Sequence, residues 1–156
     1  MAAITLTKGT LVDSVRVLYG IPEFEQAPMV RTSPAFCKEL IEINHAGKTI
    51  GCAAYNTGFI LGYEGVNFQV MAILPEFRKQ GYGSEALGLL ERRFVDNHQA
   101  VLVTGIPNDN YALDFFTKRG YSRYGRGFLG SVIVKSLQPD ILLQSKIEEQ
   151  MINSLR

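Results

Sequence analysis

The stretch that decides the predicted fold is Arg78-Lys79-Gln80-Gly81-Tyr82-Gly83, which continues as Ser84-Glu85-Ala86-Leu87. An apolar run at 68–74 precedes it and predicts a strand, and the spacing of Leu87, Leu90 and Phe94 predicts a helix after it. A helix that begins at a glycine-containing turn presents unpaired backbone N–H groups and the positive end of its dipole. Such a turn favours a phosphate group, and Gly81 and Gly83 allow close approach because they carry no Cβ.

Three phosphate-binding motifs are candidates for this turn. A P-loop requires a lysine after its last glycine, and Ser84 follows Gly83, so that motif is excluded. The dinucleotide motif G-x-G-x-x-G/A fits Gly81 to Ala86, but Pro75–Gln80 separate the glycines from the strand. The next predicted strand, 100–104, also ends without an acid for a ribose. The third motif, R/Q-x-x-G-x-G/A after a strand and a short Pro-containing loop, fits in full.

That third motif carries a family resemblance. The segment from Ile73 to Gly83 closely resembles the acetyl-CoA signature of the GNAT acetyltransferase superfamily. The segment 108–121 resembles the second signature of the superfamily, A-x-x-[FY]-[FY]-x-[KR]-x-G-[FY], and its form is most similar to the histone acetyltransferase branch. By its residues alone, 108–121 predicts a short helix with N-cap candidates at 108–110 and Gly120 at the left-handed C′ position. The resemblance covers Lys48 to Tyr121.

Composition limits the class of protein. The 156 residues suit one domain, 1–156, with 46% hydrophobic and 20% charged residues, as in a soluble protein. A net charge of +1 gives no broad attraction to nucleic acid, and we expect neither a membrane span nor a signal peptide. Cys37 and Cys52 form no metal-ligand pattern, so no metal is expected. Reduced thiols without an export signal predict a cytoplasmic location. His45 and His98 are expected at the surface.

The hydrophobic patterns predict a single mixed α/β domain. The segments 21–34 and 56–65 are expected to be irregular or turn-rich, with room for a short strand at 59–61. The end, 139–156, fits either a strand or a helix, and a helix is favoured because Pro139 suits the first helical position. The resemblance implies a GNAT fold, with a mixed, mostly antiparallel central sheet flanked by helices. The predicted helices are 10–19, 84–97 and 110–119. The predicted strands are 39–43, 49–55, 66–74, 101–104 and 128–137. The first two of these strands form a predicted hairpin with a turn at 44–48.

The resemblance also implies acetyl-CoA as cosubstrate and assigns residues to it. The backbone N–H groups of Lys79 to Ser84 would hold the pyrophosphate, and the Ser84 hydroxyl would add a contact. The strand edge at Met71–Ile73 would pair with the pantetheine arm as an added strand does, and an N–H there is a candidate oxyanion donor. Asn110 would reach the same arm. The implied cofactor set is Met71, Ala72, Ile73, Arg78, Lys79, Gln80, Gly81, Tyr82, Gly83, Ser84, Asn110 and Phe116.

Acetyl transfer to an amine requires proton removal, since a lysine amine has a pKa near ~10.4. The chain departs from its relatives here: Phe116 stands where many members have an acidic tyrosine, and Asn67 where the histone branch has a basic glutamate. Glu64, three residues earlier, is a candidate base if the strand bulges, with a solvated turn carboxylate as the alternative. Asn67 and Gln69 share a strand face on which they would order a water chain. Candidate acids are Tyr111, Tyr121 and Tyr124, with a packing or surface role as the alternative for each.

The predicted function is direct acetyl transfer from acetyl-CoA to a primary amine, and the histone-like second motif favours a protein lysine. Two alternatives remain: a small-molecule amine acetyltransferase, and a non-catalytic acyl-CoA-binding or protein-interaction module. The binding-module alternative is motivated by the absence of a glutamate at position 67 and of a tyrosine at position 116. Acceptor choice would depend on 21–34, 56–65 and 121–127, and the apolar C-terminal stretch leaves a homodimer open.

Overall fold

The computed structural model describes residues 3–26, 28–60, 62–107, 110–127 and 130–138. By its internal contacts the chain divides into two compact units. The first comprises Met1–Asn56 and Phe68–Arg93, and the second comprises Thr57–Asn67 and the chain from Phe94 onward. Two long strands, β3 (Lys48–Ile60) and β4 (Tyr63–Ile73), contribute residues to both units.

In the first unit, antiparallel strands build one sheet. Strand β1 (Ile4–Lys8) pairs with β2 (Glu39–His45), and β2 pairs with β3 around a tight turn at Ala46-Gly47, where both residues have positive φ. The register of β2 against β3 skips Ile50, which marks a bulge. The remaining elements are helical: α1 (Leu11–Tyr19), η1 (Pro22–Gln26), α2 (Pro28–Thr32), η2 (Ser33–Phe36), η3 (Pro75–Phe77) and α3 (Tyr82–Asp96).

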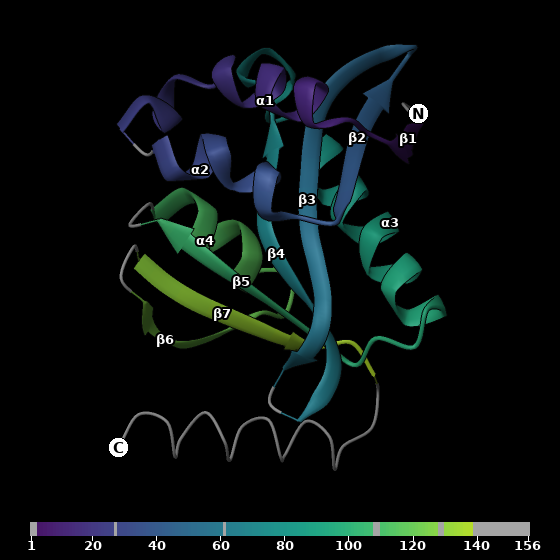
Figure 1. The fold of residues 1–156 in the computed structure, drawn as a ribbon, viewed down its shortest axis with the longest axis vertical. Helices are drawn as coiled ribbons and strands as arrows, with labels where there is room; N and C mark the ends of the chain where they lie inside the picture. The colour runs from purple at the N-terminus through teal and green to yellow at the C-terminus, as the bar shows by residue number, and fades with distance from the viewer. Residues whose placement is uncertain (1–2, 27, 61, 108–109, 128–129, 139–156) are drawn as a thin grey trace. The chain divides into compact units, whose positions relative to one another are not determined.

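Helices α1 and α3 lie on different sides of β3 (Figure 1). A hydrophobic cluster packs against the sheet under each of them. The α1 cluster joins Val17, Leu18 and Ile21 to Cys52, Ala54, Val70 and Ala72 of β3 and β4. The α3 cluster joins Ala86 to Ile4, Ile43, Ile50 and Ile73. Because the bulge at Ile50 changes the alternation of β3, Ile50 belongs to the α3 cluster and Cys52 to the α1 cluster.

Gly51 allows the close crossing of β3 and β4. A Cβ added there would overlap the carbonyl oxygen of Ala72 and lie 2.9 Å from Cδ1 of Ile73. The Leu74 N–H donates to the Ile50 carbonyl at 2.8 Å beside this crossing. The end of β4, where the glycine turn begins, is therefore fixed by main-chain packing.

The second unit contains the ends of β3 and β4 together with β5 (Val101–Pro107), α4 (Asn110–Thr117), β6 (Ser122–Gly127) and β7 (Gly130–Ser136). Strand β7 pairs antiparallel with both β5 and β6. The start of β4 meets the residue before β5 through the Ala100 N–H, which donates to the Glu64 carbonyl at 2.7 Å. Val101 and Val134 form the core, with Ile60 and Tyr63 packed against it.

The strand order is β1-β2-β3-β4-β5-β7-β6. A mixed, mostly antiparallel sheet with flanking helices was predicted, and it is confirmed. No helix among the described residues is long and apolar enough to cross a membrane. The described residues likewise hold no group of three or more side chains suited to a metal ion.

Several predicted boundaries were wrong. The segment 21–34 is not irregular but carries the short helices η1 and α2 and the start of η2, and 56–65 is not a turn-rich connection, because β3 continues to Ile60 and β4 begins at Tyr63. The β2–β3 turn is shorter than 44–48. Strands β1 and β6 fall outside the predicted elements. The alternatives for 139–156 lie outside the described residues.

Candidate functional site

The turn before α3 has the backbone conformation that an anion site needs. After η3, Lys79 and Gly81 both have positive φ, 62° and 84°. The Glu85 N–H donates to the Gly81 carbonyl at 3.0 Å, so the N–H groups of Tyr82 and Gly83 precede the first helical hydrogen bond. Lys79, Gln80 and Gly81 are exposed. An exposed turn with amide groups at the positive end of a four-turn helix is suited to a phosphate.

The side chain of Arg78 makes three hydrogen bonds within the protein. Its Nε donates to the Ile73 carbonyl at 2.9 Å, and its two terminal nitrogens reach the Glu23 carboxylate at 2.6 and 3.4 Å. The hydrogen bond from Arg78 is the main cause that lowers the pKa of Glu23 below its usual value. The side chain of Arg78 thus joins η1 to the end of β4.

Tyr82 anchors the start of α3. Its hydroxyl lies 3.3 Å from Nε2 of His45, and the two ring centroids are 4.7 Å apart. The Tyr82 ring also packs against the α3 cluster. His45, which was expected at the surface, is half-buried: its ring lies on Tyr82, and its Nδ1 is buried without a hydrogen-bond partner among the described residues. His98 is exposed, as predicted.

Strand β4 carries the predicted pantetheine edge and the two polar residues. Ala72 and Ile73 are buried and Met71 is half-buried. Asn67 and Gln69 are exposed and alternate with the buried Phe68 and Val70. The structure therefore places Asn67 and Gln69 on one face of β4, as the sequence predicts.

Glu64 is an exposed residue at the second position of β4, and its carbonyl accepts the bond from Ala100. Between the exposed Glu64 and Asn67, the two consecutive residues Gly65 and Val66 are both buried, so the alternation of burial is interrupted there.

In the second unit, the end of α4 fixes two predicted residues against each other. The Gly120 N–H donates to the Thr117 carbonyl and the Tyr121 N–H to the Phe116 carbonyl, both at 3.2 Å, and Gly120 has φ 88°. This is a Schellman motif, and the predicted left-handed Gly120 is confirmed. The rings of Phe116 and Tyr121 meet edge to face, 5.1 Å apart, and Tyr121 is 3% exposed. The side chains of Asn110 and Tyr111 lie outside the described part of the chain.

The model of the acetyltransferase (GNAT) family matches residues 16–121, which is more than half of the chain. The chain belongs to this family. No curated protein sequence was found to match the chain.

Solved GNAT structures share the fold. A ribosomal-protein-S18-alanine N-acetyltransferase from Escherichia coli superposes with a TM-score of 0.62 at 13% identity, covering 88% of this chain and 96% of its own. PaiA N-acetyltransferase from Thermoplasma acidophilum, in complex with coenzyme A, gives 0.65 at 12% identity over 86% and 99% of the two chains. A GNAT acetyltransferase from Elizabethkingia anophelis with acetyl-CoA bound gives 0.61 at 18% over 84% and 95%. At these identities the likeness shows the fold alone.

The structure shows two residues in contact with the candidate phosphate turn that sequence reasoning missed. Glu23 is 55 residues from its partner Arg78, and His45 is 37 residues from its partner Tyr82. Neither belongs to a local motif, so no sequence signal distinguishes them. In the first unit, the structure brings Ile73 and the turn 78–84 together at the end of β4 and the start of α3. In the second unit, it brings Phe116 and Tyr121 together.

Proposed function

We propose that this GNAT protein is an acetyl-CoA-dependent N-acetyltransferase that moves the acetyl group directly to a primary amine. The observation that carries the proposal is the exposed turn at the start of α3, with left-handed residues at Lys79 and Gly81, in a chain whose family consists of acetyltransferases. The match from 16 to 121 extends through both compact units, which supports a single catalytic domain over 1–156. Both cysteines are free thiols, which fits a reducing compartment such as the cytoplasm.

Acetyl-CoA is the cosubstrate. The backbone N–H groups of Lys79 to Ser84 bind its pyrophosphate, and the β4 edge at 71–73 and Asn110 bind its pantetheine arm. Two of the similar GNAT structures hold coenzyme A or acetyl-CoA, which supports this assignment. The amide groups at a helix N-terminus bind phosphate by charge and direction, so they need no particular side chain there.

Transfer is direct, within a ternary complex of enzyme, acetyl-CoA and amine, and no acyl group becomes bound to the enzyme. The neutral amine attacks the thioester carbonyl carbon, a C–N bond forms, and the C–S bond breaks with CoA leaving as a thiolate. A backbone N–H of 71–73 stabilises the oxyanion. The proton lost by the amine passes through water ordered by Asn67 and Gln69 or to Glu64, and a tyrosine, Tyr111 or Tyr121, protonates the thiolate.

The acceptor class proposed is an amino group of a protein. The second motif, in its resemblance to the histone branch, favours a lysine. The E. coli structure is named for an enzyme that acts on an alanine of ribosomal protein S18, which supports a protein amine in this fold. A small-molecule amine is the competing acceptor, and a non-catalytic acyl-CoA-binding module is the competing function because Phe116 and Asn67 do not titrate.

The test is transfer from labelled acetyl-CoA in a cell lysate, with label counted separately in protein and small-molecule fractions. A Gly81→Val variant, expected to lose cosubstrate binding, serves as the matched control for acetylation by lysate enzymes. Label in the protein fraction above this control is the expected result. Label in small molecules alone would move the acceptor class, and no label in a protein shown to bind acetyl-CoA would favour the binding module.

A second experiment assigns the base. The pH–rate profile of the wild type is compared with that of Glu64→Gln. If Glu64 is the base, the limb of the profile that reports its deprotonation disappears and turnover falls by about 10²-fold or more. Unchanged turnover would remove Glu64 from the mechanism and leave the water path beside Asn67.

A further inference from the structure

Three segments of the first unit meet at one guanidinium group. Arg78 lies at the start of the phosphate turn, Glu23 lies in η1, and Ile73 is the last residue of β4. The two terminal nitrogens of Arg78 face the two carboxylate oxygens of Glu23, and Nε faces the Ile73 carbonyl. A guanidinium presents its donors in a fixed planar fork, so these contacts define the position of Arg78 in more than one direction.

Glu23 lies in a segment that is packed against the hydrophobic core. Its neighbour Phe24 packs against the α1 cluster of Val17, Leu18 and Ile21, and the Phe24 N–H donates to the Ile21 carbonyl at 3.2 Å. The carboxylate of Glu23 is thus presented by a helical turn that is packed onto the core. Arg78 is 28% exposed and Glu23 is 53% exposed in their side chains. The ion pair is therefore screened in part by water, and its effect is moderate.

We propose that Arg78 is not a phosphate ligand but a strut, by which we mean a side chain that holds the phosphate turn in place through its bonds to Glu23 and Ile73. Glu23 is then a positioning residue for acetyl-CoA. Resting on the proposed function, this inference assigns a role to a residue outside the cosubstrate site. Arg78 has an extended backbone, φ −77° and ψ 163°, and Lys79 follows with φ 62°. The backbone changes direction between Arg78 and Lys79. Because the Arg78 side chain is bonded to both η1 and β4, the orientation of the backbone at the start of this turn is fixed. The amide groups of the turn are then oriented before the ligand arrives, which lowers the entropy lost on binding.

The two roles of Arg78 predict opposite effects of one substitution. If Arg78 were a phosphate ligand, Glu23→Gln would release the guanidinium from a competing carboxylate and would tighten CoA binding. If Arg78 is a strut, the same substitution loosens the turn and weakens CoA binding. The sign of the change therefore decides between them.

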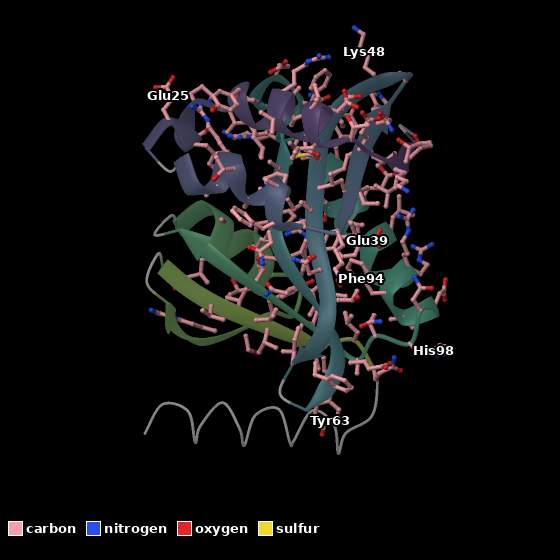
Figure 2. The ribbon with its side chains drawn as sticks, in the orientation of Figure 1. Glu25, Glu39, Lys48, Tyr63, Phe94 and His98 are labelled. Carbon is pink, nitrogen blue, oxygen red and sulfur yellow. The ribbon has the colours of Figure 1, made fainter. Side chains whose placement is uncertain are left out.

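The chain offers a matched control in Glu25. It lies in the same short helix, is exposed, and takes part in neither ion pair found among the described residues. Figure 2 shows its side chain directed away from the fold. Glu25→Gln removes the same charge from the same element without touching Arg78.

The experiment is calorimetric titration of coenzyme A into wild type, Glu23→Gln and Glu25→Gln, with melting temperatures measured without ligand. We expect Kd to rise about three- to five-fold in Glu23→Gln and to stay within about 1.5-fold in Glu25→Gln, as suits a partly screened ion pair. Pantetheine, which lacks the pyrophosphate, is titrated in parallel by NMR. Its affinity should not change in Glu23→Gln, whereas general destabilisation would weaken both ligands.

Arg78→Lys provides a second variant if Glu23→Gln folds poorly. Lysine keeps the positive charge that a phosphate ligand needs, but it lacks the fork that bonds Glu23 and Ile73 together. We expect a higher Kd for CoA in Arg78→Lys. An unchanged or lower Kd in Arg78→Lys or in Glu23→Gln would overturn the proposal that Arg78 is a strut. Absence of CoA binding by the wild type would overturn the proposed function and this inference with it. Binding by the wild type with no effect of Glu23→Gln would overturn the inference alone.

Discussion

Gly81 is the residue of the phosphate turn whose backbone conformation most clearly requires glycine. Its φ is 84°, and a Cβ added there would meet no atom within 4 Å. The cost of a side chain is therefore conformational and not a clash. Gly81→Ala should lower the free energy of unfolding by about 1 kcal/mol, because a left-handed conformation is unfavourable for alanine. Urea denaturation measures this change, and calorimetry should show weaker CoA binding.

Gly88→Ala is the control for that substitution. Gly88 lies inside α3, its φ is not positive, and an added Cβ would again meet nothing within 4 Å. Alanine is the better helix former, so this variant should gain about 1 kcal/mol of stability. Equal losses in Gly81→Ala and Gly88→Ala would contradict the conformational explanation of Gly81.

The two cysteines should react at very different rates. Cys52 is 1% exposed, and burial raises the pKa of its thiol to about 12, whereas Cys37 is half-buried with a pKa raised in the same direction. The thiolate is the reactive form, so both should react slowly at pH 7 and Cys37 should react faster as the pH rises. Iodoacetamide pulses followed by mass spectrometry should label Cys37 in the native protein and Cys52 only after unfolding. Equal labelling of the native protein would be inconsistent with this burial.

Among the elements, α1 depends on its first residue. Thr10 is the N-cap: its Oγ1 accepts from the Asp13 N–H at 3.2 Å and donates to the Asp13 carboxylate at 2.6 Å. Thr10→Ala should lower the free energy of unfolding by about 1 kcal/mol, and Thr10→Ser should retain most of it. Thermal denaturation of the three proteins checks the order. A Thr10→Ser protein as unstable as Thr10→Ala would show that the hydroxyl is not the cause.

The same cap has a pH dependence with a defined sign. The hydrogen bond from Thr10 is the main cause that lowers the pKa of Asp13 below 3.8. A depressed carboxyl pKa contributes stability above the unfolded value, and that contribution is lost as the pH falls through the folded value. The difference between wild type and Thr10→Ala should therefore narrow below about pH 4. A difference that grows in acid would contradict the assignment.

Elements with a buried face were predictable, and exposed ones were not. Helices α1, α3 and α4 and the β2–β3 hairpin follow from apolar spacing and turn residues. Strand β6, Ser122–Gly127, contains no aliphatic residue, and its conformation comes from pairing with β7. The second half of β3 is mostly exposed, so it has no alternating signal.

The candidate site divides in the same way. The turn at 78–83 was predictable because glycine spacing directly reflects backbone geometry. Glu23 and His45 were not, because their contacts with Arg78 and Tyr82 depend on tertiary packing between distant segments. The acid and base stay predictions, since the two positions that the resemblance indicates for them hold Phe116 and Asn67.

For the whole molecule, the continuity of β3 and β4 determines how unfolding should proceed. Both strands contribute residues to each compact unit, so each unit depends on strands that it shares with the other. We expect one cooperative thermal transition, with equal calorimetric and van't Hoff enthalpies, and a shift of the whole transition by CoA. Differential scanning calorimetry with and without CoA measures both. Two resolved transitions would overturn the single-domain proposal.

The crossing at Gly51 has a consequence for mutational surveys of this chain. No side chain fits where β3 passes the Ala72 carbonyl, so a library that replaces every residue in turn should retain only glycine at position 51. Its intolerance would resemble that of a catalytic residue, although it would arise from the spacing of two backbones. Abundance and activity scored separately would distinguish the two, because variants at position 51 should disappear from the soluble fraction before their activity can be measured.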